Sequence, residues 1–82
     1  MLETKDVKLE DVYVPAKRRK TLEVDKVESL ALSIIELGQQ TPIQVRPDKD
    51  RFVLVSGLHR LEALRALGEE TVRALIVGTH RR

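Results

Sequence analysis

The hydrophobic spacing along this chain changes repeatedly between the two-residue period of strands and the period of about 3.6 residues that is typical of helices. Residues 6–14 are predicted to form a short strand or an extended arm. The other predicted strands are residues 43–46, 51–55 and 71–77, and the predicted helices are residues 26–37 and 58–67. This β-α-β-β-α-β order predicts an α+β (mixed α/β) fold with a mixed sheet. We expect a single domain over residues 1–82, with its core at about residues 6–77.

The first predicted helix has recognisable signals at both ends. Asp25 followed by Glu28 has the form of a capping box at its start, and Gly38 suits the position just after its end. Residues 15–25, which precede this helix, are expected to form a polar loop. At the other end of the chain, the tail GTHRR is expected to be frayed and its His80 inert.

Composition excludes several kinds of chemistry. The chain has no cysteine, so it offers no disulfide, thiolate nucleophile or thiolate metal site. Only Tyr13 and Phe52 are aromatic, which predicts an aliphatic core and argues against a stacking surface for single-stranded nucleic acid. Two histidines without suitably spaced carboxylates predict no metal site. The charged start and the lack of a membrane-length apolar run predict a cytoplasmic protein with no membrane partner.

The junction between the third predicted strand and the second helix holds the most informative motif. Gly57 breaks the strand, and Arg60 lies in the first turn of the helix, in the middle of its apolar arc and beside His59. The helix dipole already presents positive charge there, so an unaccompanied cation is unfavourable. Either Arg60 pairs with an internal carboxylate or with backbone carbonyls, or the junction binds a phosphate through backbone N–H groups, His59 and Arg60.

A polar stripe runs along the first predicted helix beside its apolar face. It consists of Lys26, Ser29 and Ser33, which fall on one side of a helix. Such a stripe is usually solvated surface. It gains a functional meaning only if it faces the Gly57 junction, which periodicity does not show.

One dense basic cluster stands in the predicted polar loop. Its members are Lys17, Arg18, Arg19 and Lys20. A solvated loop is one interpretation, and contact with phosphate or nucleic acid is the other. The net charge of +2 for the whole chain adds little support for nucleic-acid binding.

Taken in order, these segments resemble the N-terminal domain of ParB-type partition proteins. The resemblance rests on VP at residues 14–15, a basic stretch, DKVESLALSIIELG, TPIQVRP, FVLVSGLHRLEALRALG and TVRALIV. DKVESLALSI together with SGLHR also resembles sulfiredoxin, a distant relative with the same fold. The resemblance covers about residues 6–77 and implies a small ParB/sulfiredoxin-like domain.

The resemblance further implies a nucleotide pocket. In sulfiredoxin-like proteins, ATP is held by a lysine and two hydroxyl residues of the first helix, by a His-Arg pair after the glycine, and by an arginine of the preceding loop. The matching residues of this chain are Lys26, Ser29, Ser33, His59, Arg60 and, for the loop, Arg18 or Arg19. Leu58 stands where sulfiredoxin has its catalytic cysteine, so sulfinic-acid reduction is not expected. ParB proteins bind CTP through a glutamate and two arginines, and the missing glutamate weighs against CTP here.

The leading functional hypothesis is a ParB-like domain that binds a nucleoside triphosphate, ATP or CTP, with or without Mg²⁺. Its setting would be DNA partition or plasmid or phage gene control. The alternatives are a ParB-fold enzyme, either a nuclease or a small kinase or NTPase, and a non-catalytic interaction module whose pocket has lapsed. DNA would be contacted directly or through a helix-turn-helix domain that these 82 residues do not contain. Homodimerisation stays open, as does whether the chain is an excised domain or a complete protein.

Overall fold

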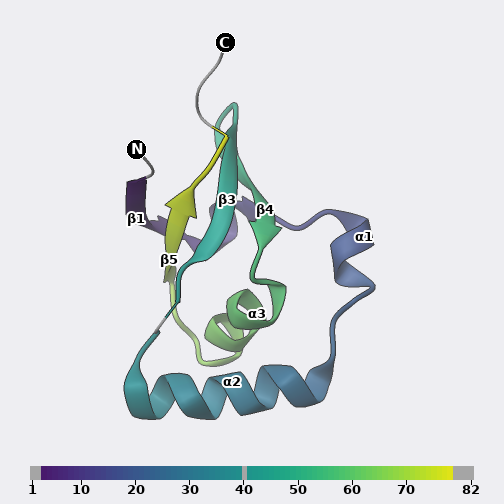
Figure 1. Ribbon diagram of the computed structural model, residues 1–82, viewed down its shortest axis with the longest axis vertical. Coiled ribbons are helices and arrows are strands. Elements are labelled where there is room, and N and C mark those ends of the chain that lie inside the picture. Colours follow the sequence, from purple (N-terminus) through teal and green to yellow (C-terminus); the bar gives the residue numbers. More distant parts are fainter. Residues whose placement is uncertain (1–2, 40, 79–82) are drawn as a thin grey trace.

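The computed structural model describes residues 3–39 and 41–78. Its strands are β1 (Glu3–Lys8), β2 (Val12–Tyr13), β3 (Ile43–Asp48), β4 (Arg51–Ser56) and β5 (Thr71–Ile76). Its helices are η1 (Leu9–Asp11, a 3₁₀ turn), α1 (Ala16–Arg19), α2 (Val24–Leu37) and α3 (Leu58–Ala66). The strands form one mixed sheet in the order β1-β5-β3-β4-β2, with β1–β5 and β3–β4 antiparallel and β3–β5 and β2–β4 parallel (Figure 1). The predicted α+β fold with a mixed sheet is confirmed.

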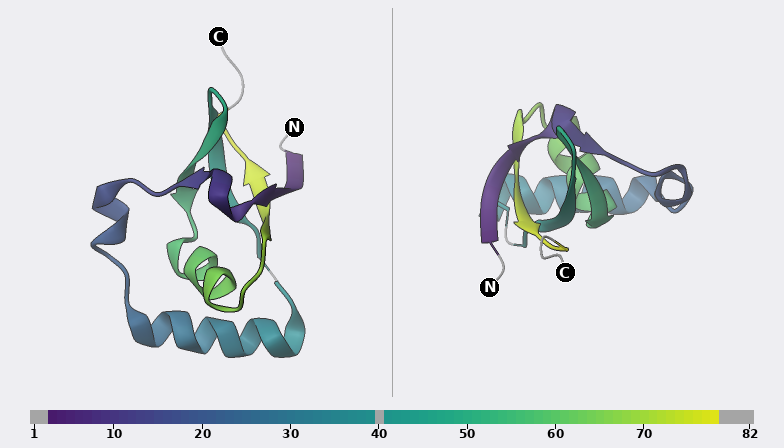
Figure 2. Two further views of the ribbon diagram at one scale, coloured as in Figure 1. Left: turned by 180° about the vertical axis from the view of Figure 1, so that it is seen from behind. Right: turned by 90° about the horizontal axis from the view of Figure 1, so that it is seen from above.

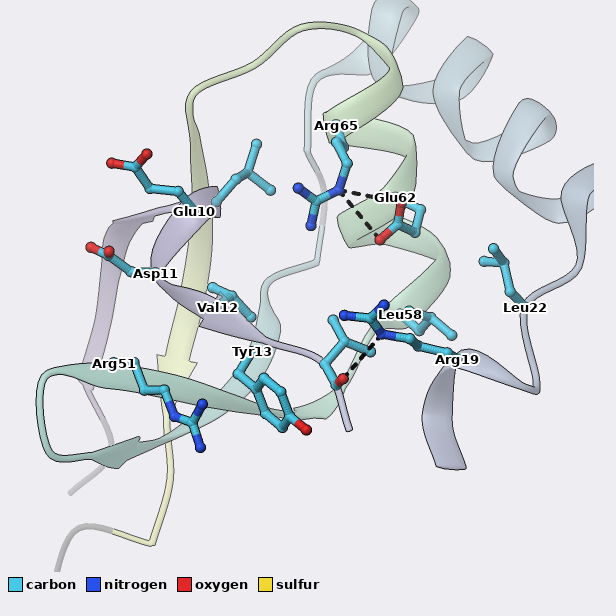
Figure 3. Close-up of a pocket in the computed structure, with 12 residues that line it drawn as sticks. Glu10, Asp11, Val12, Tyr13, Arg19, Leu22, Arg51, Leu58, Glu62 and Arg65 are labelled. Carbon is cyan, nitrogen blue, oxygen red and sulfur yellow. Dashed lines mark hydrogen bonds and ion pairs between the residues drawn. The ribbon is translucent and has the colours of Figure 1, made fainter. Parts of the chain in front are cut away.

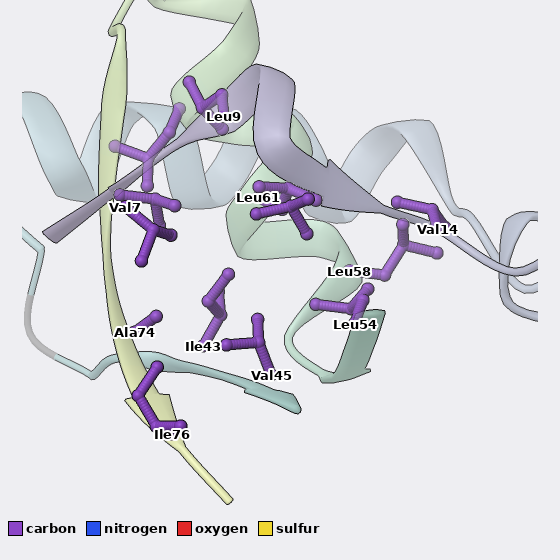
Figure 4. Packing of buried hydrophobic residues seen from close by; sticks show 13 residues of the cluster. Val7, Leu9, Val14, Ile43, Val45, Leu54, Leu58, Leu61, Ala74 and Ile76 are labelled. Atoms are coloured by element: carbon purple, nitrogen blue, oxygen red, sulfur yellow. The ribbon is translucent and has the colours of Figure 1, made fainter. Parts of the chain in front are cut away.

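The helices form two layers against this sheet. α3 packs on the sheet, and α2 packs on the side of α3 that faces away from the sheet (Figures 1 and 2). α3 therefore buries four of its residues, whereas α2 buries none. The core is aliphatic, as predicted, and its cluster consists of Val7, Leu9, Val12, Val14, Ile43, Val45, Leu54, Leu58, Leu61, Leu64, Val72, Ala74 and Ile76 (Figure 4).

Residues 6–14, predicted as a short strand or an extended arm, are not one continuous element, because η1 separates the end of β1 from β2. Val7 and Leu9 are buried, and so are Val12 and Val14. The step of three residues from Leu9 to Val12 would put these two side chains on opposite faces of a continuous strand. The 3₁₀ turn shifts the register by one residue, so that both ends of the segment face the core.

The polar loop predicted over residues 15–25 was also partly wrong. It contains the short helix α1, and α2 already begins at Val24. The capping box of Asp25 and Glu28 does not form, because Glu23 is the N-cap residue and no side chain caps the helix. The apolar periodicity that located the helix begins inside its first turn, so the true start was placed too late.

The strands predicted over residues 43–46 and 51–55 form a hairpin, and they and the two elements after them match the structure within one or two residues. β3 continues through Pro47 to Asp48, so that the turn consists of Lys49 and Asp50. Lys49 has a φ of +59°, the left-handed conformation that closes this turn. Pro47 is part of β3, because its fixed φ is compatible with a strand near a hairpin end.

Gln39, in the connector after α2, ties that connector to the start of β5. Its Oε1 accepts the N–H of Arg73 at 2.9 Å, and its Nε2 donates to the carbonyls of Thr41 at 2.9 Å and of Arg73 at 3.1 Å. One amide side chain thus satisfies both backbone polar groups of Arg73, as a neighbouring strand would.

Two further expectations were a frayed C-terminal tail and the absence of a membrane-spanning segment. Residues 79–82, which include His80 and most of the tail expected to be frayed, lie outside the described residues. In the part of the chain that is described, no helix is both long and apolar enough to cross a membrane.

Candidate functional site

Gly57 sets the geometry of the candidate site. It is the N-cap residue of α3, with φ of 106° and ψ of 30°, a left-handed conformation that glycine adopts readily. A Cβ atom at this position would lie 2.8 Å from Cγ2 and 3.1 Å from Cα of Ile43. Because one of these contacts is with backbone, the neighbour cannot move aside easily. The sharp strand-to-helix turn therefore requires glycine.

The turn leaves the start of α3 without a side-chain cap. Leu61 is the first residue whose N–H bonds within the helix, to the Gly57 carbonyl at 2.9 Å. The N–H groups of Leu58, His59 and Arg60 precede it, at the positive end of the helix dipole. Arg60 is half-buried, and no residue within the described ranges forms an ion pair or hydrogen bond with its guanidinium. This helix start concentrates unneutralised positive charge.

His59 joins the start of α3 to the start of α2. Its Nε2 accepts a hydrogen bond from the backbone N–H of Glu23, the N-cap residue of α2, at 2.9 Å. An imidazole that accepts at Nε2 in its neutral form carries its proton on Nδ1. The second nitrogen of His59 is consequently a hydrogen-bond donor.

Of the polar stripe of α2, which consists of Lys26, Ser29 and Ser33, only Lys26 forms an ion pair. The Nζ of Lys26 lies 3.4 Å from a carboxylate oxygen of Glu23, and both side chains are exposed to solvent. Ser29 is exposed and Ser33 is half-buried. The structure thus brings His59, Glu23 and Lys26 into one cluster between the two helix starts, with the serines further along the same helix.

The four residues of the basic cluster differ in their contacts. Lys17, Arg18 and Lys20 are exposed on α1 and just after it. Arg19 instead donates its Nε–H to the carbonyl of Val14 at 3.2 Å. Arg19, held by this hydrogen bond, lines a cavity that hydrophobic periodicity did not predict (Figure 3).

That cavity has a volume of about 630 Å³ and lies between η1, β2, α1 and α3. Leu22, Leu58 and Val14 contribute apolar surface, and Tyr13 stands at its edge with the Arg51 guanidinium 4.2 Å from the ring centroid (Figure 3). Its full lining is Leu9, Glu10, Asp11, Val12, Tyr13, Val14, Arg19, Leu22, Arg51, Leu58, Glu62 and Arg65. Periodicity could not reveal it, because its walls come from segments far apart in sequence.

The cavity and the predicted phosphate ligands do not coincide. Of the predicted residues only Arg19 lines it, whereas Gly57, His59, Arg60 and the α2 stripe do not. Leu58, the first residue of α3, is the point where the cavity meets the helix start. Two adjoining regions therefore exist, an anion-attracting helix start and a partly apolar cavity. Among the described residues no group of three or more His, Asp or Glu side chains is arranged to hold a metal ion.

The five-stranded mixed sheet and the glycine-opened helix define a ParB/sulfiredoxin-like domain. The crystal structure of sulfiredoxin from Arabidopsis thaliana superposes with a TM-score of 0.81 at 34% identity, covering 90% of this chain and 83% of that one. The C-terminally truncated ParB of Caulobacter crescentus, complexed with CTP-gamma-S, gives a TM-score of 0.77 at 29% identity, covering 90% of this chain and 43% of that one.

The sequence comparison narrows the class to one family. The chain belongs to the ParB N-terminal domain family, whose model matches residues 2–82. It is 37% identical over 62 residues to the probable chromosome-partitioning protein ParB of Campylobacter jejuni, across 76% of this chain. The chain spans only 22% of the length of that relative and 57% of the Arabidopsis sulfiredoxin sequence.

Proposed function

We propose that this chain is the nucleotide-binding module of a ParB-type protein and holds the phosphates of a nucleoside triphosphate at the start of α3. The observation that carries the proposal is the strand-to-helix turn at Gly57. That turn presents three uncapped N–H groups beside Arg60, a cation with no ion-pair partner in the described part of the chain. A phosphate at this point would satisfy the N–H groups and neutralise the arginine together.

His59 and Arg60 have distinct roles in this proposal. Since Nε2 of His59 accepts the Glu23 N–H, Nδ1–H is the group that remains to donate to a phosphate oxygen. Arg60 supplies the full charge that the neutral imidazole lacks. Lys26 contributes less, because it is exposed and already close to the Glu23 carboxylate. Ser29 and Ser33 are assigned as hydroxyl contacts of the same nucleotide by the family resemblance, and Arg18 as an outer charge.

The cavity beside Leu58 is the proposed place of the nucleoside. Its volume of about 630 Å³ falls within the range of roughly 300–1,000 Å³ that small-molecule pockets occupy. Arg19 lines it, held by the Val14 carbonyl, and would lie between nucleoside and phosphates. Leu58 replaces a carboxylate that CTP-binding ParB proteins carry, so we expect ATP to be preferred over CTP.

The wider role is proposed on family membership. A ParB-type module acts in DNA partition or in plasmid or phage gene control, in the cytoplasm, with DNA contacted directly or through a further domain. Dimerisation driven by the nucleotide belongs to the same proposal. Mg²⁺ would be held chiefly by the phosphates, since the described residues provide no ready-made metal site.

Calorimetric titration of the chain with ATP, CTP and GTP, with and without Mg²⁺, tests the proposal. Arg60→Ala should weaken triphosphate binding by at least about tenfold, because a charge-assisted contact contributes roughly 1.5–3 kcal/mol. Lys26→Ala should weaken it less. Arg73→Ala is the matched control, since Arg73 is exposed on β5 with Asp6 as its 3.8 Å partner.

If none of the three nucleotides binds, the proposed nucleotide site is wrong, although the fold assignment is unaffected. Equal losses for Arg60→Ala and Arg73→Ala would show a general charge effect instead of a site. Phosphate release in the same samples tests the NTPase alternative, which predicts turnover where a binding module predicts none.

A further inference from the structure

The outer face of α2 carries exposed apolar side chains that the fold does not use. Val24, Leu32 and Ile35 are 65%, 67% and 66% exposed. Their separations of eight and three residues place them within about 80° of one another around the helix. No residue of this helix is buried, and α2 packs on α3. The half-buried residues of α2 occupy other positions around the helix and are Val27, Leu30, Ala31, Ser33 and Ile34. Isolated exposed leucines are common, but an aligned set on one helix face indicates an interaction surface.

The same face carries three carboxylates and no base. Glu28 lies between Val24 and Leu32 in one row with a spacing of four residues, and Asp25 and Glu36 flank it. All three acids are exposed, and no ion pair within residues 3–39 and 41–78 involves any of them. Lys26, the one base of α2, lies beside Glu23 on another side of the helix.

The position of Glu28 determines what can cover this face. Any surface that contacts both Val24 and Leu32 must also cover the carboxylate between them. A covered charge is strongly unfavourable unless a cation pairs with it. The occupant must therefore supply apolar side chains and a positive charge at a fixed spacing.

A second copy of the chain does not meet this requirement. In an antiparallel pairing about the middle of the apolar row, Glu28 of each copy would face Ala31 and Leu32 of the other, with no cation near. The like charges of the two acidic faces would also repel. An anionic membrane surface is disfavoured for the same reason.

We propose that the outer face of α2 docks a basic amphipathic helix of a partner protein. The partner helix carries a lysine or arginine one turn from an apolar side chain on either side, so that its cation pairs with Glu28 while its apolar residues cover Val24 and Leu32. This surface is made of exposed residues of α2 and includes none of the residues assigned to the proposed nucleotide site.

Two synthetic amphipathic helices test the proposal. They are identical except at the centre of the apolar row, which is lysine in one peptide and glutamate in the other. In fluorescence anisotropy, the chain should bind the lysine peptide at least about tenfold more tightly than the glutamate peptide. Glu28→Lys should reverse this preference, and Leu32→Ala should weaken both peptides. Glu3→Lys, the same charge reversal on exposed β1, should leave the preference unchanged.

Equal binding of the two peptides, or a preference that Glu28→Lys does not reverse, would overturn the proposal. Circular dichroism shows whether each variant keeps its helix content, and folding should persist because the substituted side chains are exposed. Sedimentation tests the remaining alternative, which is that a second copy of the chain covers this face. A wild-type dimer that Leu32→Asp dissociates would assign this face to a second copy and contradict the partner helix.

Discussion

The imidazole Nε2 of His59 accepts the backbone N–H of Glu23 at 2.9 Å, across 36 positions of sequence. In a capping box, the side chain of the third helical residue accepts the N–H of the N-cap residue. In α2 that third residue is Lys26, which has no acceptor, and a histidine from another helix performs the function instead. The start of α2 is thereby fixed to the start of α3.

His59→Ala should release this attachment. Losing one hydrogen bond at a partly exposed position should lower the free energy of unfolding by about 1 kcal/mol. Hydrogen exchange should show faster exchange of the Glu23 amide, whereas the Leu61 amide, bonded to the Gly57 carbonyl, should be unaffected. If Glu23 exchange is unchanged in the variant, the histidine does not hold α2.

Gly57→Ala should destabilise the fold more than the same change at another left-handed glycine. The new Cβ would approach Ile43 to within 2.8 Å and would also stand at a φ of 106°. We expect a loss of roughly 2–5 kcal/mol from strain and overpacking together. Gly68 has a φ of 80° with nothing within 4 Å, so Gly68→Ala should lose only about 1–2 kcal/mol. Urea denaturation of both variants measures the difference, and equal losses would contradict the close approach to Ile43.

Removing the three residues of the basic cluster other than Arg19 should weaken binding to DNA without altering sequence preference. Arg19 is engaged with Val14, so the test changes Lys17, Arg18 and Lys20 to alanine. The slope of log affinity against log salt should fall by roughly 2–3, one contact per charge removed.

A control for that experiment changes three other exposed bases, Lys5, Lys8 and Arg46, and so preserves the total charge lost. Filter-binding or anisotropy titrations at several salt concentrations supply the slopes. Indistinguishable slopes for the two triple variants would exclude α1 as a DNA-contacting surface.

The chain should not reduce a sulfinic acid. By the sulfiredoxin resemblance Leu58 matches the catalytic cysteine, and in this structure it is only 6% exposed and belongs to the core. Without a thiolate, no group can attack an activated sulfinic phosphoryl ester. Mass spectrometry of a hyperoxidised peroxiredoxin incubated with ATP and the chain should show intact sulfinate. Arabidopsis sulfiredoxin is the positive control, and repair by this chain would contradict the prediction.

Most of the regular helices and strands could be predicted from sequence because their signals are local. β3 and β5 each alternate buried and exposed residues, β4 is a short apolar run, and Gly57 marks the turn between β4 and α3. η1 and α1 could not be predicted in this way. η1 shifts the period by one residue, and α1 is a single turn of mostly charged residues without an apolar stripe.

The position of His59 and Arg60 at a helix start was predictable from sequence, but their contacts with other elements were not. His59 and Arg60 were identified from their position at a helix start, yet the bond from His59 to Glu23 depends on how two helices pack. The need for glycine at position 57 likewise depends on Ile43, which the pairing of β3 with β4 brings close. The cavity beside Leu58 depends on tertiary contacts of the same kind.

The pairing of β1 with β5 has a mechanical consequence. The two strands are antiparallel, so that Glu3, at the start of one, lies opposite Ile76, at the end of the other (Figure 1). Tension applied between these two points would load the ladder at one end and open its hydrogen bonds singly, as a zipper opens, instead of shearing them together. Under load the sheet would peel from this edge toward Lys8 and Thr71. Removal of the outermost strand would thus precede any disturbance of α3.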